Sequence, residues 1–147
     1  DSAEITTKDW QHAWEVVAGL LANKGAFLQA FGSLVTEAKS PEFIEPLAGE
    51  VHIDELLAFR GPAVELVRNP ASRFAYTVQT DSDLVLLFVD GESYELNRTC
   101  LSAVRTLCAD ELENIFNVSD LWQTDESRSL ICRLVQSGAL WLAEKED

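Results

Sequence analysis

Apolar residues recur every three to four positions through residues 6–39, in two blocks separated by a polar break. This spacing places each block on one face of a helix. The first block holds Trp10, Ala13, Trp14, Val17, Ala18 and Leu21, and the second holds Phe27, Leu28, Phe31, Leu34, Val35 and Ala38. The pattern predicts two amphipathic helices in succession, which form a helical hairpin.

The ends of both helices carry their own signals. Thr6, with Asp9 three residues later, resembles a capping box and predicts the start of the first helix. Asn23-Lys24-Gly25 interrupts the apolar pattern, and Gly25 can adopt the positive φ that often ends a helix. Ser40-Pro41 ends the second helix, because a residue before proline avoids helical geometry.

Residues 40–62 separate this hairpin from the rest of the chain. Residues 40–53 hold two prolines and a glycine and are expected to form a loop, and Asp54 can cap a short helix to Phe59. Gly61-Pro62 ends that helix. We therefore expect two regions, a helical dimerisation and linker region over 1–60 and a second domain over 61–147.

The second region begins with strands. Three apolar runs, Arg73–Gln79, Leu84–Val89 and Ser93–Leu96, are separated by turns at residues 80–83 and 90–92. Asp90-Gly91 between two such runs is a strong hairpin signal. Two successive hairpins predict an antiparallel meander.

Helical signals then return. Asn97 can cap a helix that carries Leu101, Val104, Leu107 and Cys108, and Asp110–Phe116 is expected to form a short acidic helix followed by a turn at 118–122. Thr124 or Asp125 can cap a helix that ends before Gly138, and Ala139–Leu142 is a last short strand. The fold class is therefore α+β, with an N-terminal helical hairpin followed by a winged-helix-like domain with a small antiparallel sheet.

Composition narrows the class of protein. The chain has 147 residues and a formal net charge of −14, and it holds no basic cluster longer than a pair. A phosphate-binding surface needs several cations on one face, so DNA and anionic membranes are disfavoured as ligands. The chain lacks an apolar run long enough to span a bilayer and lacks a signal peptide at its start.

Two further details of composition concern origin and location. The sequence begins at Asp1 and contains no Met, which predicts a processed chain or a piece of a larger protein. Its three Cys have no zinc-binding spacing, and Cys100 and Cys108 are too far apart along one helix to bridge. Reduced, buried cysteines suit a cytoplasmic protein.

Candidate catalytic groups are few. His52-Ile53-Asp54 supplies two of the three ligands of a 2-His-1-carboxylate iron site, but no His follows it, so a linker His beside a capping Asp is the favoured interpretation. With two His in the chain, a Ser or Cys nucleophile lacks a plausible base. Acid pairs such as Asp81/Asp83 are expected to be solvated surface. We expect no catalytic, metal or cofactor residues.

The aromatic stripe on the predicted hairpin is the candidate interface, consisting of Trp10, Trp14, Phe27, Phe31 and Leu34. Two helices cannot bury two such faces against each other alone. The stripe either packs on the rest of the same chain or forms an interface with a second subunit or another domain.

Several segments resemble one protein family. Trp14–Lys39, with the core sequence FGSLVTEAK at 31–39, is similar to the helical region that follows the catalytic domain of bacterial JmjC-type, cupin-fold, 2-oxoglutarate-dependent ribosomal-protein arginine hydroxylases. Leu66-Val67-Arg68, Phe88–Glu92 and Leu134–Trp141 resemble successive landmarks of the terminal winged-helix domain of that family. The sequence departs from the family in its acidic turn at 81–83 and at Asp90, where Asn is usual.

The resemblance implies that this chain is the non-catalytic C-terminal part of such an oxygenase. It implies a parent with an upstream domain that binds Fe(II) and 2-oxoglutarate, a basic ribosomal protein as substrate, and a homodimer made by the helical region. Two alternatives remain: a winged-helix regulator that binds nucleic acid, and an acidic adaptor that binds a basic protein. Against the first, Asp125–Ser137, the best recognition-helix candidate, carries two Arg, two acids and no Lys.

Overall fold

The computed structural model describes residues 4–49, 52, 65–109, 115–117, 121 and 123–143. The described elements are α1 (Thr7–Ala22), α2 (Lys24–Thr36), the 3₁₀ turn η1 (Pro41–Phe43), β1 (Glu65–Arg68), β2 (Phe74–Val78), β3 (Leu84–Val89), β4 (Glu92–Asn97), the 3₁₀ turn η3 (Arg98–Cys100), α4 (Leu101–Cys108), β5 (Ile115–Asn117), α6 (Asp125–Gln136) and β6 (Leu140–Leu142). None of the described helices is long and apolar enough to cross a membrane.

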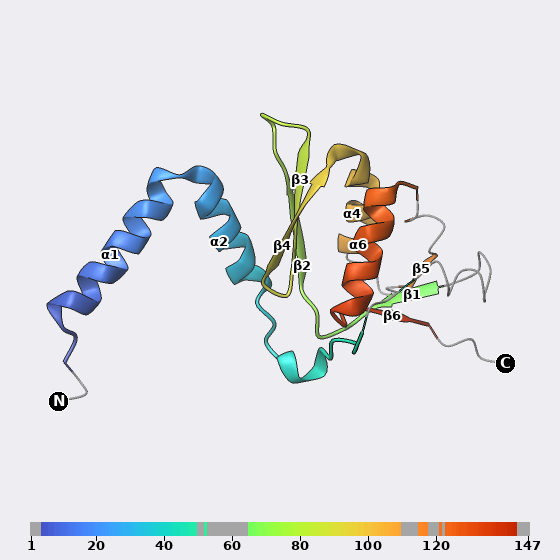
Figure 1. Ribbon diagram of the computed structural model, residues 1–147, viewed down its shortest axis with the longest axis horizontal. Coiled ribbons are helices and arrows are strands. Elements are labelled where there is room, and N and C mark those ends of the chain that lie inside the picture. The colour runs from blue at the N-terminus through green and yellow to red at the C-terminus, as the bar shows by residue number, and fades with distance from the viewer. Residues whose placement is uncertain are drawn as a thin grey trace.

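The strands form two small antiparallel sheets. One has the order β2-β3-β4 and is the predicted meander, and the other has the order β5-β1-β6. Figure 1 shows α1 and α2 on one side of the meander and α4 and α6 on its other side. The α+β class, with a pair of helices followed by a winged-helix domain, is confirmed.

The core lies between the meander and the helices α4 and α6. Alternate residues of β3, namely Val85, Leu87 and Val89, face this core and are at most 2% exposed. They pack with buried residues of the two helices, among them Val104, Leu107, Leu130, Ile131 and Leu134. This side of the sheet is the hydrophobic centre of the winged-helix domain.

The opposite face of β3 is also covered. Leu86 and Phe88 are 3% and 2% exposed although they do not belong to the main core. Helix α2 lies on this face, and a Cβ added at Gly32 would be 2.3 Å from the Phe88 ring. A strand buried on both faces reads as a continuous apolar run, which explains why Leu84–Val89 shows no alternation.

A buried hydroxyl fastens the end of α2 to the tip of the β3–β4 hairpin. Thr36 is 1% exposed; its Oγ1 donates to the Gly32 carbonyl at 2.8 Å and accepts from the Gly91 N–H at 3.1 Å. Asp90 and Gly91 have φ values of 51° and 87°, which fits the type I′ turn expected for this dipeptide. The predicted β-hairpin at Asp90-Gly91 is confirmed, and the bond from Gly91 to Thr36 attaches α2 to it.

The linker after α2 runs along the C-terminal end of the chain. The buried Asn69 side chain donates to the carbonyls of Phe43 and Gly138, each at 3.0 Å. The Leu47 N–H donates to the Gln136 carbonyl at 2.9 Å. These bonds connect the linker to the ends of β1 and α6. The predicted division near residue 60 lies outside the described residues and stays a prediction.

The caps of α1 and α6 agree with the sequence, whereas both ends of α2 differ. Helix α2 was expected to continue to Ser40-Pro41 but ends at Thr36, because Glu37, with a ψ of 126°, leaves helical geometry. Thr6 and Thr124 cap α1 and α6 as expected, and Gly138 has a φ of 85°. Gly25 was expected to take a positive φ, but it lies within α2. Asn23 makes the break instead, because its extended backbone ends α1 and its side chain accepts from the Ala26 N–H.

The segment between α4 and α6 differs from expectation. Ile115 and Phe116 were predicted to end a short helix, but they belong to β5, which pairs with β1. The strand β1 was not predicted as a strand at all. The expected helix at 54–59 lies outside the described residues, as do residues 110–114 and most of the predicted turn at 118–122.

Candidate functional site

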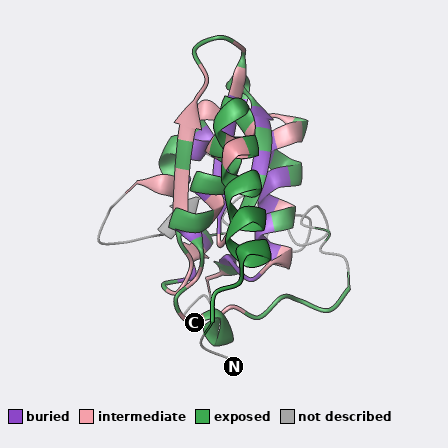
Figure 2. Cartoon of the chain, turned by 90° about the vertical axis from the view of Figure 1, so that its left-hand side faces the viewer, coloured by how far each residue is buried: buried purple, intermediate pink, exposed green. Residues whose placement is uncertain are grey.

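The most prominent surface feature is an apolar face on α1 and α2. Its residues are the five singled out from the sequence, and their exposed fractions are 53% for Trp10, 65% for Trp14, 47% for Phe27, 53% for Phe31 and 68% for Leu34. We call these five residues the aromatic face. Figure 2 shows exposed residues running along the helix nearest the viewer.

The helical period places the members of this face that belong to one helix on the same side of that helix. Trp10 and Trp14 are four residues apart on α1, and Phe27 and Phe31 are four residues apart on α2, so each pair shares one side of its helix. The rings of Phe27 and Phe31 stack with centroids 6.1 Å apart. The opposite side of α2, with Gly32 and Thr36, is buried against the meander.

Helix α1 contributes no buried residue. Its apolar side, which also includes Val17 at 48% exposed and Leu21 at 66%, therefore does not pack on the described part of the chain. Exposed apolar surface on this scale marks a site of association. The aromatic face can bury its rings only against another apolar surface.

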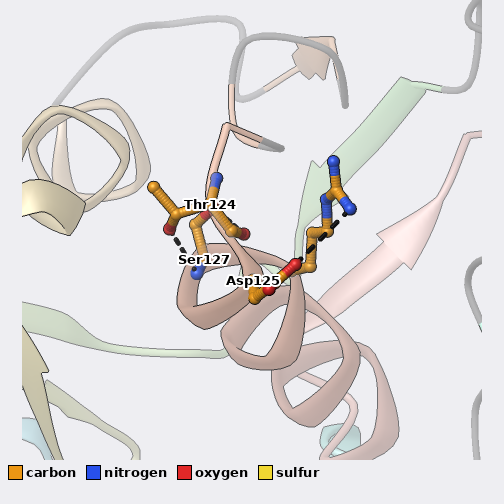
Figure 3. A network of polar contacts seen from close by, with 4 residues as sticks. Thr124, Asp125 and Ser127 are labelled. Atoms are coloured by element: carbon orange, nitrogen blue, oxygen red, sulfur yellow. Dashed lines mark hydrogen bonds and ion pairs between the residues drawn. The ribbon is translucent and has the colours of Figure 1, made fainter.

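Helix α6 was the candidate for nucleic-acid recognition, and its two arginines are both engaged. Arg128 pairs with Asp125 at 3.6 Å in the first turn of the helix, beside the capping bonds between Thr124 and Ser127 (Figure 3). The Arg133 guanidinium lies over the Tyr94 ring, 4.4 Å from its centroid. Burial raises the pKa of Tyr94, and the nearby Arg133 charge opposes that shift. Both arginines of α6 are therefore in contact with other side chains of the described chain.

The cysteines behave as buried thiols. All three are unbridged; Cys100 is buried and the other two are partly buried. Burial raises the pKa of Cys108 to about 11, with Arg68 opposing the shift, and burial also raises the pKa of Cys100. A raised pKa keeps the thiol protonated and unreactive at neutral pH.

His52 is exposed, and it lines a hollow with Tyr94, Arg133 and Gln136. The other two members of its motif, Ile53 and Asp54, lie outside the described residues. Within the residues the structure describes, no three His, Cys, Asp or Glu side chains lie close enough together to hold a metal ion.

A second surface was missed by the sequence reasoning. Phe43, Leu47 and Trp141 are 66%, 50% and 46% exposed and lie where the linker passes β6. A signal for it was present, because Trp141 stands between two leucines on a strand, and alternation places its side chain on the face opposite theirs.

Comparison with known proteins gives a consistent result. The family model for the ROXA-like winged helix matches residues 19–141. Two crystal structures of YcfD from Escherichia coli, one described as a ribosomal oxygenase, are similar to this chain with TM-scores of 0.64 and 17% sequence identity. A YcfD structure in complex with cobalt and 2-oxoglutarate has a TM-score of 0.62, also at 17% identity. No curated protein sequence matches significantly.

The coverage of these matches is unequal. The similarity to the three YcfD structures extends over 97–98% of this chain but over only 36–38% of theirs. The chain thus spans little more than a third of the length of these neighbours. At this level of identity the likeness shows the shared fold.

Proposed function

Because the chain belongs to the ROXA-like winged-helix family, we propose that it is the non-catalytic C-terminal module of a 2-oxoglutarate-dependent protein hydroxylase. The observation that carries the proposal is the unequal coverage, since nearly all of this chain matches one third of a ribosomal oxygenase. In the proposed parent, an upstream JmjC-type cupin domain binds Fe(II) and 2-oxoglutarate. The parent hydroxylates a basic ribosomal protein in the cytoplasm.

The module's own contribution is assembly and support. The aromatic face forms the homodimer, and the winged-helix domain buttresses the catalytic domain. Support for the dimer comes from the exposure of Trp10, Trp14 and Phe31, which nothing in the described chain covers. Burial of apolar surface is worth roughly 25 cal/mol per Å², so such rings are a strong driving force for association.

The winged-helix regulator is the weaker candidate. Its recognition helix would be α6, whose two arginines are engaged within the module by Asp125 and Tyr94. The net charge of −14 repels phosphate. A salt-sensitive complex with duplex DNA would favour that function over the one proposed.

Activity of the chain and of its natural full-length gene product tests the catalytic assignment. Each protein is incubated with Fe(II), 2-oxoglutarate and ribosomal proteins, and succinate formation is measured. We expect turnover only with the full-length product. Turnover by the present chain, or a full-length product without an oxygenase domain, would overturn the proposal.

Two adjacent valines on α1 provide a matched test of the dimer. Val17 lies on the apolar side of α1 and Val16 does not, yet they are 48% and 50% exposed. A buried unpaired charge is costly, so Val17→Asp should yield a monomer in sedimentation equilibrium, as should Phe31→Asp. Val16→Asp should remain dimeric. A monomeric wild-type chain, or equal behaviour of the two valine variants, would contradict the dimer.

A further inference from the structure

The exposed surface beside β6 contains a groove with one apolar wall on each side. The linker forms one wall, and the end of α6 with strand β6 forms the other. We call it the β6 groove, and define it by Glu42, Phe43, Glu45, Pro46, Leu47, Ala48, Val135, Gly138, Leu140, Trp141 and Leu142. Its walls are held in place by the bond from the Leu47 N–H to the Gln136 carbonyl.

Strand β6 is an edge strand, and its register shows which backbone groups are unpaired. Among the strands that the structure describes, the sheet order β5-β1-β6 leaves one side of β6 without a neighbour. The Ala143 N–H donates to Glu65 and the Asn69 N–H donates to Ala139, so residues 139, 141 and 143 are the ones bonded to β1. In an antiparallel pair the intervening residues point their N–H and C=O groups the other way.

Leu142, which is partly exposed, therefore presents its N–H and C=O toward the open edge, whereas Leu140 is 1% exposed and its outward groups are covered. No hydrogen bond to these groups is present within the described part of the chain. An edge of this kind is a template for pairing with an added strand. Both leucines line the β6 groove, so a segment that pairs with Leu142 would lie along it.

The groove offers contacts for side chains as well as for backbone. Phe43 and Leu47 are 66% and 50% exposed on the linker wall, and Trp141 is 46% exposed on the strand. A paired extended segment alternates its side chains between two faces, so every second residue can contact these apolar groups. Pairing by backbone and selection by alternate side chains is an established mode of peptide recognition.

The charge of the groove selects the kind of segment. Glu42 and Glu45 line the linker wall and are exposed, and the molecule as a whole carries −14. A segment in which Lys or Arg alternates with apolar residues would complement both the acids and the apolar walls. We propose that the β6 edge binds an extended basic segment of a partner protein as an added strand.

This inference names a second contact with the basic protein partner and rests on the proposed function for that partner's class. Its geometry rests on the described residues alone. The module would hold a tail or extension of the substrate protein away from the catalytic domain. It thereby helps to recruit the substrate without touching the reacting atoms.

The sharpest test removes one outward N–H. Proline at position 142 removes a donor that points away from β1 and leaves the Ala143 bond intact, so Leu142→Pro blocks the edge without breaking the existing pair. Leu142→Ala is the control, since it loses the same side chain but keeps the N–H. Circular dichroism and urea unfolding are used to check that both variants are folded.

Binding is measured by fluorescence anisotropy with a labelled peptide of alternating Lys and Val, and the same peptide with Glu in place of Lys is the control ligand. We expect the Lys peptide to bind the wild-type chain, and Leu142→Ala gives the affinity that remains once the Leu142 side chain is lost from the groove, so Leu142→Pro is compared with that variant. Leu142→Pro should bind at least about tenfold more weakly, because it loses a hydrogen bond and meets the proline ring. Equal binding by the two variants would overturn the inference.

A charge reversal tests the selection. The double variant Glu42→Lys, Glu45→Lys should no longer bind the Lys peptide and should bind the Glu peptide. Glu95→Lys, at an exposed site on β4, should change the affinity for neither peptide. Absence of binding by any peptide would overturn the inference, as would a change in oligomeric state of Leu142→Pro, which would assign the edge to a second copy. Succinate formation by the full-length protein is measured separately, so the proposed function can survive either result.

Discussion

The ring of Phe88 lies directly against the α-carbon of Gly32, so closely that a methyl group there would be 2.3 Å from two ring atoms. No side chain larger than hydrogen fits between α2 and β3 at this point. The contact fixes how near the helix approaches the outer face of the meander. Together with the Thr36 bond to Gly91, it holds α2 on the winged-helix domain.

Gly32→Ala should therefore destabilise the protein. The Phe88 ring is 2% exposed and cannot swing away, so we expect a loss of about 1–3 kcal/mol in the free energy of unfolding measured in urea. Gly19→Ala on α1 is the control, because nothing lies within 4 Å of its added methyl. A helical Gly→Ala change without a clash favours the helix by up to about 1 kcal/mol. A neutral Gly32→Ala would contradict the packing of α2.

Two glycines with nearly equal φ separate backbone strain from steric contact. Gly138 and Gly49 have φ values of 85° and 84°, but only at Gly138 would a Cβ meet another group, the Glu45 carbonyl oxygen at 2.5 Å. Gly49→Ala should cost about 1–2 kcal/mol through strain alone. Gly138→Ala should cost more, since the linker must also move. Equal losses in urea unfolding would show that the linker does not press on this turn.

The threonine caps of α1 and α6 provide a test of how each helix is held. Each accepts a bond from an N–H three residues later, Thr6 from Asp9 and Thr124 from Ser127. Thr124→Ala should lower the stability of the whole domain by about 1 kcal/mol. Thr6→Ala should leave the cooperative transition of a monomeric variant unchanged and lower only its helical content, because α1 buries nothing. Equal shifts in both variants would contradict this.

Stability should fall in alkaline solution through Cys108. Its pKa rises from 9.0 to about 11 on folding, so the unfolded chain releases the thiol proton first. The folded state is then disfavoured as pH rises between these two values, whereas below about pH 8 both states keep the proton and the contribution is constant. Urea unfolding at pH 8 and pH 10 should show a smaller decline for Cys108→Ala than for the wild type. An identical decline would remove Cys108 as the cause.

Local signals predicted the elements that depend on neighbouring residues. The Asp90-Gly91 hairpin, the Thr124 cap and the turn at Gly138 follow from side chains that act within a few positions of themselves. The strands β1 and β5 were missed because each is short and gains its structure by pairing with residues far away in the chain. Ile115 and Phe116 follow an acidic stretch that resembles a helix, and nothing local signals their pairing with β1.

The coverage of β3 on both faces could have been predicted and was not. Six apolar residues in succession at 84–89 indicate a strand that is buried on both faces. The helices predicted within residues 6–39 have apolar faces that could cover its second face. The aromatic face was identified from the helical period, which shows that such a face exists. The period cannot show what covers it, and the dimer remains a prediction.

Residues of this chain are under two different constraints, packing within the fold and contact with another surface. The side chains of β3 pack against α2 on one face and against α4 and α6 on the other, so a substitution there changes the stability of the folded chain. Helix α1 has no residue buried by the described part of the chain. Its residues are free to change in step with an outside surface, so a selection for folding alone would overlook them and a selection for assembly would find them first.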